Sequence, residues 1–206
     1  MVGAKKYILT NETIDIGWGV ILHRIQAVRD IPRYGVKAGD LGGFIESEKN
    51  LSQDGDCWVG GEAWVSGEAL VYENAWVIGK ARIYGRARIH ECVQVDGEAR
   101  IYEDAEAYGD AVVSGNVSVF GNAKVFGKAW VYGEAWIYGN AMIYGYAKIY
   151  GKARIYGIAK VHSYAMIFGN VWIYGNADID SALVANGDVR LHGDANDCGV
   201  LPCPRE

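Results

Sequence analysis

Proline and cysteine are scarce in this sequence, and no long apolar run occurs. The 206 residues include 3 prolines and 4 cysteines. No segment approaches the roughly 20 apolar residues that span a bilayer. The first residues lead into no apolar stretch that ends in a small-residue cleavage site. We therefore expect a cytoplasmic protein without membrane contact.

The four cysteines, Cys57, Cys92, Cys198 and Cys203, are too few and too scattered for a disulfide framework. The last two form a C-x4-C pair without the second half of a zinc site. The four histidines offer no closely spaced set, and phosphate loops, nucleophile elbows and H-E-x-x-H motifs are lacking. We expect free thiols, no metal and no cofactor. Asp178-x-Asp180 faces outward in the pattern below, and we interpret it as solvated.

The charge balance also restricts function. The net charge is −5 and the pI is about 5.4, which disfavours a dedicated binder of nucleic acid or membrane surfaces. Half of the residues are hydrophobic, too many for a disordered chain. The composition therefore indicates a globular protein and disfavours nucleic acid as its partner.

The sequence does contain a six-residue repeat, seen clearly in AWIYGNAMIYGYAKIYGKARIYG (residues 135–157). Every sixth residue from Val59 to Ile179 is β-branched except Ala107. A glycine stands two places after each of them, with five exceptions: Glu73, Glu91, Glu103, Ser163 and Ser181. The repeat continues from Leu51 to Ala195 without insertion or deletion.

Alternation along A-x-[IV]-Y directs the Ala and Ile/Val side chains to one side of a short strand, and x and Tyr to the other. The following Gly-x pair turns the chain, because glycine accepts backbone angles that strain other residues. Three such hexads close a triangular coil of 18 residues, so the repeat predicts about eight coils. At about 4.8 Å per layer, the stack is about 40 Å long.

This spacing of aliphatic and small residues resembles the hexapeptide-repeat family, with an aromatic where that family favours glycine or an acidic residue after the aliphatic position. The resemblance implies the hand of the coil. We therefore predict an all-β fold, a single-stranded left-handed parallel β-helix of about eight triangular coils with a small N-terminal β cap. Residues 24–59 resemble the N-terminal segment of uncharacterised bacterial and phage hexapeptide-repeat proteins labelled as acyltransferases, a label taken from the fold.

We divide the chain into a capping segment (1–50), the β-helix (51–195) and a C-terminal cap or tail (196–206). Residues 7–16 and 20–31 have strand-like apolar content and are separated by Gly17 and Gly19. Residues 199–204 cannot continue the hexads. An uncovered first or last coil would leave open strand edges that template association, so both ends are expected to be covered.

Because the inward Ala and Ile/Val residues fill the triangle, the aromatic rings must lie on three outer walls, where residues 18 apart stack. Stacked aromatic and β-branched residues stabilise neighbouring strands, but a wide aromatic surface also indicates an interface. Two walls are mixed: one carries Trp58, Trp76, Trp130, Tyr132, Tyr150 and Phe168, the other His90, Tyr108, Phe126, Tyr144 and His162. On the third wall the candidate binding residues are Arg82, Tyr84, Arg100, Tyr102, Trp136, Tyr138, Arg154, Tyr156, Trp172 and Tyr174.

His90 and His162 are the weak catalytic candidates. They share a wall but lie four coils apart, roughly 19 Å, too far for one small substrate. The known acyltransferases of the family commonly carry an excursion loop that helps to build the site, and this repeat has none.

We therefore predict a non-catalytic scaffold or binding protein that self-associates or captures a partner through its Arg/Trp/Tyr wall. The alternatives are an acyl-CoA-type acyltransferase and, from the resemblance to phage proteins, a host-interacting binding protein. The expected partners are further copies of the chain, with a trimer favoured, an anionic planar small molecule, or a host protein.

Overall fold

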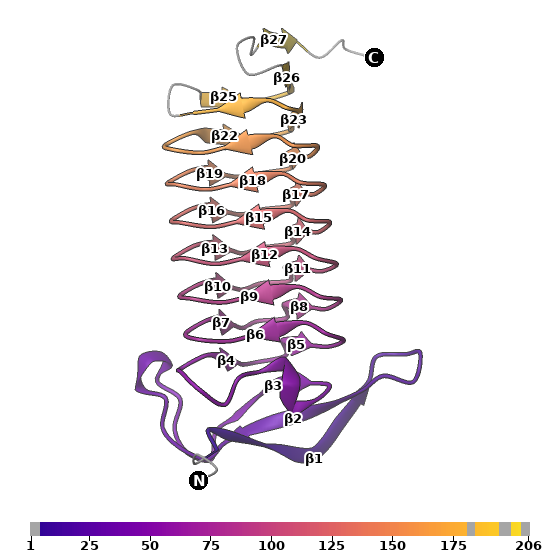
Figure 1. Ribbon diagram of the computed structural model, residues 1–206, viewed down its shortest axis with the longest axis vertical. Helices are drawn as coiled ribbons and strands as arrows, with labels where there is room; N and C mark the ends of the chain where they lie inside the picture. Colours follow the sequence, from indigo (N-terminus) through magenta and orange to yellow (C-terminus); the bar gives the residue numbers. More distant parts are fainter. Residues whose placement is uncertain (1–4, 181–183, 194–198, 203–206) are drawn as a thin grey trace.

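The computed structural model describes residues 5–180, 184–193 and 199–202. Its coils stack along one long axis, with the N-terminal strands across one end of the stack (Figure 1). Strands with the same place in successive coils pair in parallel, and this produces three sheets that form the walls of a prism. The predicted fold class is confirmed as an all-β parallel β-helix of about eight coils.

The first wall, here called the arginine wall, belongs to a 12-stranded sheet in the order β1-β2-β3-β5-β8-β11-β14-β17-β20-β23-β26-β27. Its parallel strands within the coils are β5 (Trp64–Val65), β8 (Arg82–Ile83), β11 (Arg100–Ile101), β14 (Ser118–Val119), β17 (Trp136–Ile137), β20 (Arg154–Ile155), β23 (Val171–Gly175) and β26 (Val189–Gly193). Partners in adjacent strands are 18 residues apart, as in Trp136–Arg154 and Arg154–Trp172.

The other two walls follow the same register. The histidine wall contains β6 (Leu70–Val71), β9 (Arg88–Ile89), β12 (Glu106–Ala107), β15 (Lys124–Val125), β18 (Met142–Ile143), β21 (Lys160–Val161) and β24 (Asp178–Ile179). The mixed wall contains β4 (Trp58–Val59), β7 (Trp76–Val77), β10 (Gln94–Val95), β13 (Val112–Val113), β16 (Trp130–Val131), β19 (Lys148–Ile149), β22 (Met166–Phe168) and β25 (Val184–Asn186).

The core is a column of small and β-branched side chains inside the prism. Ala141 and Ile143 are fully buried, as are the equivalent residues of the neighbouring coils. Backbone N–H groups of one coil donate to carbonyls of the next, for example Trp136 N to Ala153 O at 2.8 Å. Each layer therefore combines apolar burial with a continuous ladder of hydrogen bonds along the axis.

The corners require left-handed backbone angles. At Gly109, φ is +78°, and an added Cβ would lie 2.7 Å from the backbone nitrogen of Gly127. Four residues other than glycine adopt these angles at hexad corners: Glu73, Glu91, Glu103 and Ser163. Two of these glutamates contact the following coil, where Glu73 Oε2 accepts from Glu91 N at 2.9 Å and Glu103 Oε2 accepts from Gly121 N at 2.8 Å. These bonds offset part of the cost of left-handed geometry.

The N-terminal segment covers the first coil with a small antiparallel sheet. β1 (Tyr7–Asp15) and β2 (Ile21–Ala27) form a hairpin, and β3 (Leu41–Ile45) pairs with β2 on one side and with β5 on the other. The two predicted strands are therefore present, except that the second ends earlier. Ile31 makes only an isolated bridge to Val36, because Pro32 begins the 3-10 helix η1 (Pro32–Tyr34).

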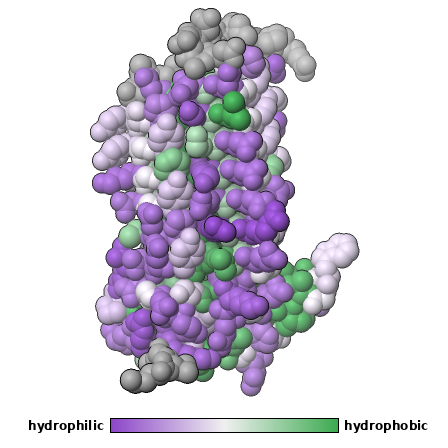
Figure 2. Space-filling model, in the orientation of Figure 1, coloured by the Kyte–Doolittle hydropathy of each residue, from purple (hydrophilic) through white to green (hydrophobic). Residues whose placement is uncertain are grey.

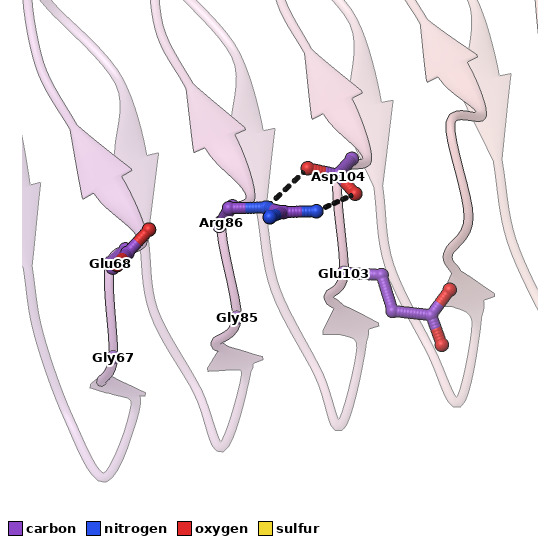
Figure 3. A pocket seen from close by; sticks show the side chains of 6 residues that line it. All are labelled: Gly67, Glu68, Gly85, Arg86, Glu103 and Asp104. Atoms are coloured by element: carbon purple, nitrogen blue, oxygen red, sulfur yellow. Dashed lines mark hydrogen bonds and ion pairs between the residues drawn. The ribbon is translucent and has the colours of Figure 1, made fainter.

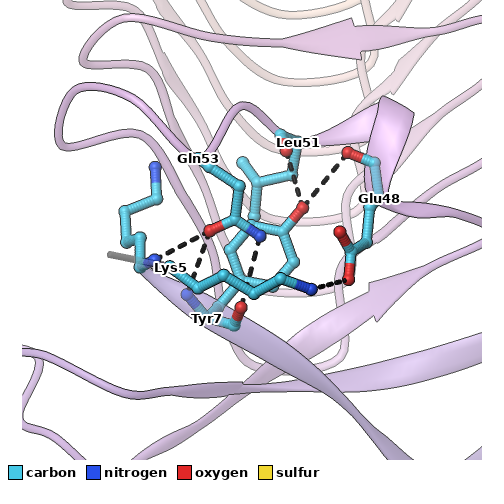
Figure 4. A network of polar contacts seen from close by, with 6 residues as sticks. Lys5, Tyr7, Glu48, Leu51 and Gln53 are labelled. Atoms are coloured by element: carbon cyan, nitrogen blue, oxygen red, sulfur yellow. Dashed lines mark hydrogen bonds and ion pairs between the residues drawn. The ribbon is translucent and has the colours of Figure 1, made fainter. Parts of the chain in front are cut away.

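Polar contacts connect this segment to the first coil (Figure 4). The hydroxyl of Tyr7 donates to Leu51 O at 2.6 Å, next to the 3-10 helix η2 (Glu48–Asn50). The Gln53 side chain accepts from Lys6 N at 2.8 Å and donates to Tyr7 O at 3.2 Å. The Gln53 amide thus bonds the backbone of β1 much as a neighbouring strand would.

At the other end, β27 (Gly199–Pro202) pairs with β26 in the antiparallel direction. This direction differs from the parallel pairing of the coils. Cys198, Cys203 and Pro204, which the sequence analysis discussed, lie outside the described residues.

Trp58 differs from its predicted environment. It belongs to the mixed wall, as expected, yet it is only 3% exposed. The indole packs beneath β3, where an added Cβ at Gly42 would lie 2.7 Å from Trp58 Cζ2. The N-terminal segment thus buries an aromatic residue that the hexad pattern alone assigns to the surface.

Candidate binding surface

The first side-chain column of the arginine wall consists mainly of guanidinium groups and indoles. The first outward position is Arg or Trp in seven of the eight coils: Trp64, Arg82, Arg100, Trp136, Arg154, Trp172 and Arg190. The Arg154 guanidinium carbon lies 5.7 Å from the Trp136 ring centre and 4.8 Å from that of Trp172. Arg82 lies 5.9 Å from the Trp64 ring. These distances are those of cation–π contacts, which hold the guanidinium groups along the wall.

Ser118 interrupts this column. It is almost buried, although it stands at an outward position. The Trp136 ring meets the ring of Phe120 edge-on, with the two ring centres 6.2 Å apart, so the indole leans toward the coil that carries Ser118. Trp136 itself remains 48% exposed.

The second column of this wall is a stack of rings. Tyr84, Tyr102, Phe120, Tyr138, Tyr156 and Tyr174 follow each other with centre-to-centre distances between 4.8 and 5.3 Å and planes within 8° of parallel. Each inner ring therefore has a ring on both faces, and solvent meets mainly ring edges and hydroxyl groups. Burial raises the pKa of Tyr84, Tyr102 and Tyr156, so these phenols stay protonated at neutral pH.

This stacking corrects the expectation of a wide exposed aromatic surface. The tyrosines of the stack are half-buried, and only a few large rings are strongly exposed on the coils: Trp130, Trp136, Tyr146 and Tyr164. The side of the prism visible in Figure 2 is mostly hydrophilic, with separate apolar spots. The ladders thus bury much of their own aromatic area within one chain.

The arginine wall is unusual in its charge. Among the described residues, no carboxylate lies within 4.0 Å of the guanidinium groups of Arg82, Arg100 or Arg154, and all three side chains are exposed. The acidic residues in the adjoining column contact lysines instead, as in Lys80–Glu98 at 3.7 Å and Lys152–Glu134 at 3.6 Å. The wall therefore presents free forked donors on a chain of negative net charge.

Arg86 shows what such a guanidinium does when a carboxylate is present. At the corner beside the arginine wall it makes two 2.6 Å hydrogen bonds to Asp104 (Figure 3). Pairing lowers the pKa of Asp104 and raises that of Arg86.

The corner that contains this pair also contains a groove of about 440 Å³, which sequence reasoning missed. The groove is lined by Gly67, Glu68, Gly85, Arg86, Glu103 and Asp104 (Figure 3). The sequence signal that could have indicated this groove is the column of charged residues after the corner, which are spaced 18 residues apart.

A second groove, of about 390 Å³, lies at the opposite end of the same corner, beside the histidine wall. Its lining combines amides, amines and apolar groups: Asn122, Lys124, Asn140, Met142, Ile158 and Lys160. Ile158 is exposed. Met142 stands between the two lysines in the strand ladder, but the amine of Lys124 contacts Glu106 and the amine of Lys160 lies 4.0 Å from Asp178, both on the sides away from Met142.

The histidine wall carries the two catalytic candidates, and the structure does not bring them together. His90 and His162 belong to one continuous ring stack, separated by Tyr108, Phe126 and Tyr144 and extended by Tyr72. Each histidine has its own carboxylate partner: His90 Nε2 lies 3.2 Å from Glu106, and His162 Nε2 lies 2.7 Å from Asp178. Both therefore act as ladder residues held by stacking and by a local carboxylate contact.

Glu106 links His90 to the neighbouring coil. Burial opposes its ionisation, but hydrogen bonds from Lys124, at 2.9 Å, and from His90 lower the pKa of Glu106 overall. Each oxygen of the carboxylate thus has a partner on the wall: Oε1 contacts His90 and Oε2 accepts from Lys124.

Within the described ranges, no three His, Cys, Asp or Glu side chains come together as ligands for a metal ion. Asp178 contacts His162. No helix in the described part of the chain has the length and hydropathy required to cross a bilayer.

A family model described as the YdcK beta solenoid repeat matches residues 135–151, about three hexads of the β-helix. No curated protein matches the chain. Over this stretch the chain is therefore similar to a β-solenoid repeat, in agreement with the stacked coils, and the match carries no acyltransferase label.

Proposed function

We propose that this protein is a β-helical binding scaffold whose arginine wall captures an extended acidic partner. The observation that carries the proposal is the row of exposed guanidinium groups of Arg82, Arg100 and Arg154. Arg82 and Arg154 lie against indoles, and no carboxylate of the described residues lies within 4.0 Å of any of the three. A guanidinium forms forked, charge-assisted bonds to carboxylate or phosphate. The wall repeats such groups along its length, which suits an extended partner.

The ring stack favours an acidic chain over a planar small molecule. A planar ligand needs an open ring face, and the inner rings of Tyr102, Tyr138 and Tyr156 are already covered on both faces. Their edges and hydroxyl groups can instead contact the backbone or polar side chains of a segment that lies along the wall. A host protein with an acidic surface is one partner of this kind, as the resemblance to phage proteins implies.

The positive charge of the guanidinium groups argues against an interface in which the arginine walls of two copies of the chain contact each other. An isologous contact would place unpaired guanidinium groups of both copies against each other, and like charges in an interface cost free energy. If the chain self-associates, we expect the interface to use the histidine or mixed wall, where Tyr146, Tyr164 and Trp130 are exposed.

The test replaces Trp136 by Ala and Arg154 by Glu together. The matched control is Trp130→Ala with Lys148→Glu on the mixed wall, because Lys148 Nζ also lies over an indole, 5.3 Å from the Trp130 ring centre. Binding of fluorescein-labelled poly-L-glutamate is measured by fluorescence anisotropy. We expect the first variant to lose about tenfold or more in affinity, the control to bind like the parent, and added salt to weaken binding.

Circular dichroism of both variants should match the parent, since neither pair supports the core. A parent that does not bind poly-L-glutamate at low salt, or an equal loss in both variants, contradicts the proposal.

A further inference from the structure

Lys6 and Cys57 form a contact that the binding function does not use. Lys6 directly precedes β1, and Cys57 directly precedes β4 in the first coil. Both residues are 0% exposed, and the Lys6 ammonium nitrogen lies 3.0 Å from the Cys57 sulfur. Lysine is almost never fully buried without a strong partner, so this pair needs an explanation.

Among the described residues, no carboxylate lies within 4.0 Å of the Lys6 amine. Its other bond in the described structure is a long one, 3.4 Å to Asp54 O. The sulfur faces three carbonyl oxygens, of Ser52 at 3.6 Å and of Asp54 and Val71 at 3.7 Å. These acceptors suit a neutral S–H group and disfavour a thiolate.

Burial sets the protonation of both groups. It lowers the pKa of Lys6 and raises the pKa of Cys57, and their mutual attraction only partly opposes it. Arg29 and Asp56 are the other charged groups that act on the Lys6 amine, in opposite directions. The pair therefore includes an uncharged amine fraction, which is nucleophilic, in contact with a sulfur atom.

We propose that Lys6 and Cys57 are a modification site, where a peroxide converts the contact into a covalent N–O–S bridge. In the first step, hydrogen peroxide oxidises the thiol to a sulfenic acid and releases one water. In the second, a further peroxide and the Lys6 amine react with the sulfenic acid, giving S–O–N and two waters. Overall, one thiol, one primary amine and two hydrogen peroxide molecules give one bridge and three waters.

The observed separation favours an inserted oxygen atom over a direct S–N bond. Covalent bonds to sulfur are about 2 Å long or shorter, so a direct bond would draw the two groups together by about 1 Å or more in a close-packed site. An oxygen between sulfur and nitrogen spans nearly the present distance. The packing around Lys6 and Cys57 therefore changes least when oxygen is retained.

The bridge would join the N-terminal segment to the first coil. Because the sulfur is buried and its pKa is raised, oxidation requires local opening around Lys6 and Cys57 and is slow. Once formed, the link restricts the unfolded chain as a disulfide does and raises the midpoint of thermal unfolding. The modification would thus strengthen the cover on the first coil under oxidising conditions.

The experiment uses the full chain with Cys92, Cys198 and Cys203 replaced by Ser, so that Cys57 is the only thiol. The protein is incubated with hydrogen peroxide and studied by high-resolution intact mass and peptide mapping. We expect a gain of about 14 Da, one oxygen added and two hydrogens lost, on a crosslinked pair of peptides containing Lys6 and Cys57. Dithiothreitol should reverse the gain, and further Lys6→Met or Cys57→Ser replacement should abolish it.

Other mass changes overturn the proposal. A gain of about 16 or 32 Da on Cys57 with Lys6 unlinked indicates ordinary oxidation, and a loss of about 2 Da indicates a direct S–N bond. Recovery of unmodified Cys57 under conditions that fully oxidise Cys92 in the parent protein excludes the site. These mass changes are measured on chains that keep both Lys6 and Cys57, so they decide the proposal even if a Lys6 variant fails to fold.

Discussion

The guanidinium carbon of Arg154 lies 4.8 Å from the ring centre of Trp172, and the Trp136 ring lies 5.7 Å from it in the preceding coil. The three residues are 18 apart in sequence and are direct register partners. The hexad period thus places a cation between two indoles, and the Arg154 side chain remains exposed.

Replacement of Arg154 by Ala should lower the free energy of unfolding by about 0.5–1 kcal/mol, because exposed cation–π contacts have this strength. Arg100→Ala is the matched control: Arg100 stands in the same column, with Arg82 and Ser118 as neighbours and no indole. Urea unfolding followed by circular dichroism measures both. Equal destabilisation would show that the indole contacts contribute nothing.

Replacement of Ala141 by Leu should overpack one triangular layer and cost about 1–3 kcal/mol, since Ala141 is fully buried. The control is Met142→Glu at the adjacent outward position. Met142 pairs with Lys124 on one side and Lys160 on the other, so a glutamate gains two cationic neighbours and stability should be unchanged or slightly raised. Thermal unfolding of both variants tests the facing of this strand.

Left-handed strain at the corners can be separated from the hydrogen bond that accompanies it. Glu103 has φ of +58° and accepts from Gly121 N. Glu103→Ala and Glu103→Gly both remove that bond, but only Ala keeps the strained backbone. We expect the Gly variant to be more stable than the Ala variant by about 1–2 kcal/mol, measured by urea unfolding. A more stable Ala variant would contradict the strain argument.

Acid should weaken the histidine wall through Glu106. The folded-state pKa of Glu106 lies below its ordinary value of 4.5, so the unfolded state takes up the proton first as pH falls. The stabilisation is complete above pH 4.5 and is lost as pH falls through the folded pKa. Glu106→Gln should therefore lose less stability than the parent between pH 5 and pH 3, as followed by urea unfolding at each pH.

Self-association remains a prediction that solution mass can test. The exposed rings of Trp130, Tyr146 and Tyr164 favour an interface between copies, and a trimer is the form expected from the family resemblance. Light scattering at micromolar concentrations should give a multiple of 22.5 kDa. A constant mass of 22.5 kDa would exclude the homo-oligomer, and those rings would then serve only their own ladders.

The coils were predictable because every hexad repeats one local rule. Inward Ala and Ile/Val, outward x and Tyr, and a left-handed corner follow from alternation and from glycine chemistry, and Ala141, Ile143 and Gly109 all have the predicted environment. Glu73, which replaces a corner glycine, keeps the left-handed backbone angle of that position, because stacking at an 18-residue spacing requires the same turn in each coil.

Only the tertiary structure showed how the walls are covered and charged. The burial of Trp58 depends on β3, and the contact of Lys6 with Cys57 depends on how the N-terminal segment crosses the first coil. The free guanidinium groups depend on which lysines compete for the nearby carboxylates. These features arise from side chains far apart in sequence, whose final distances depend on packing and competing charges, and a six-residue period contains no information about either.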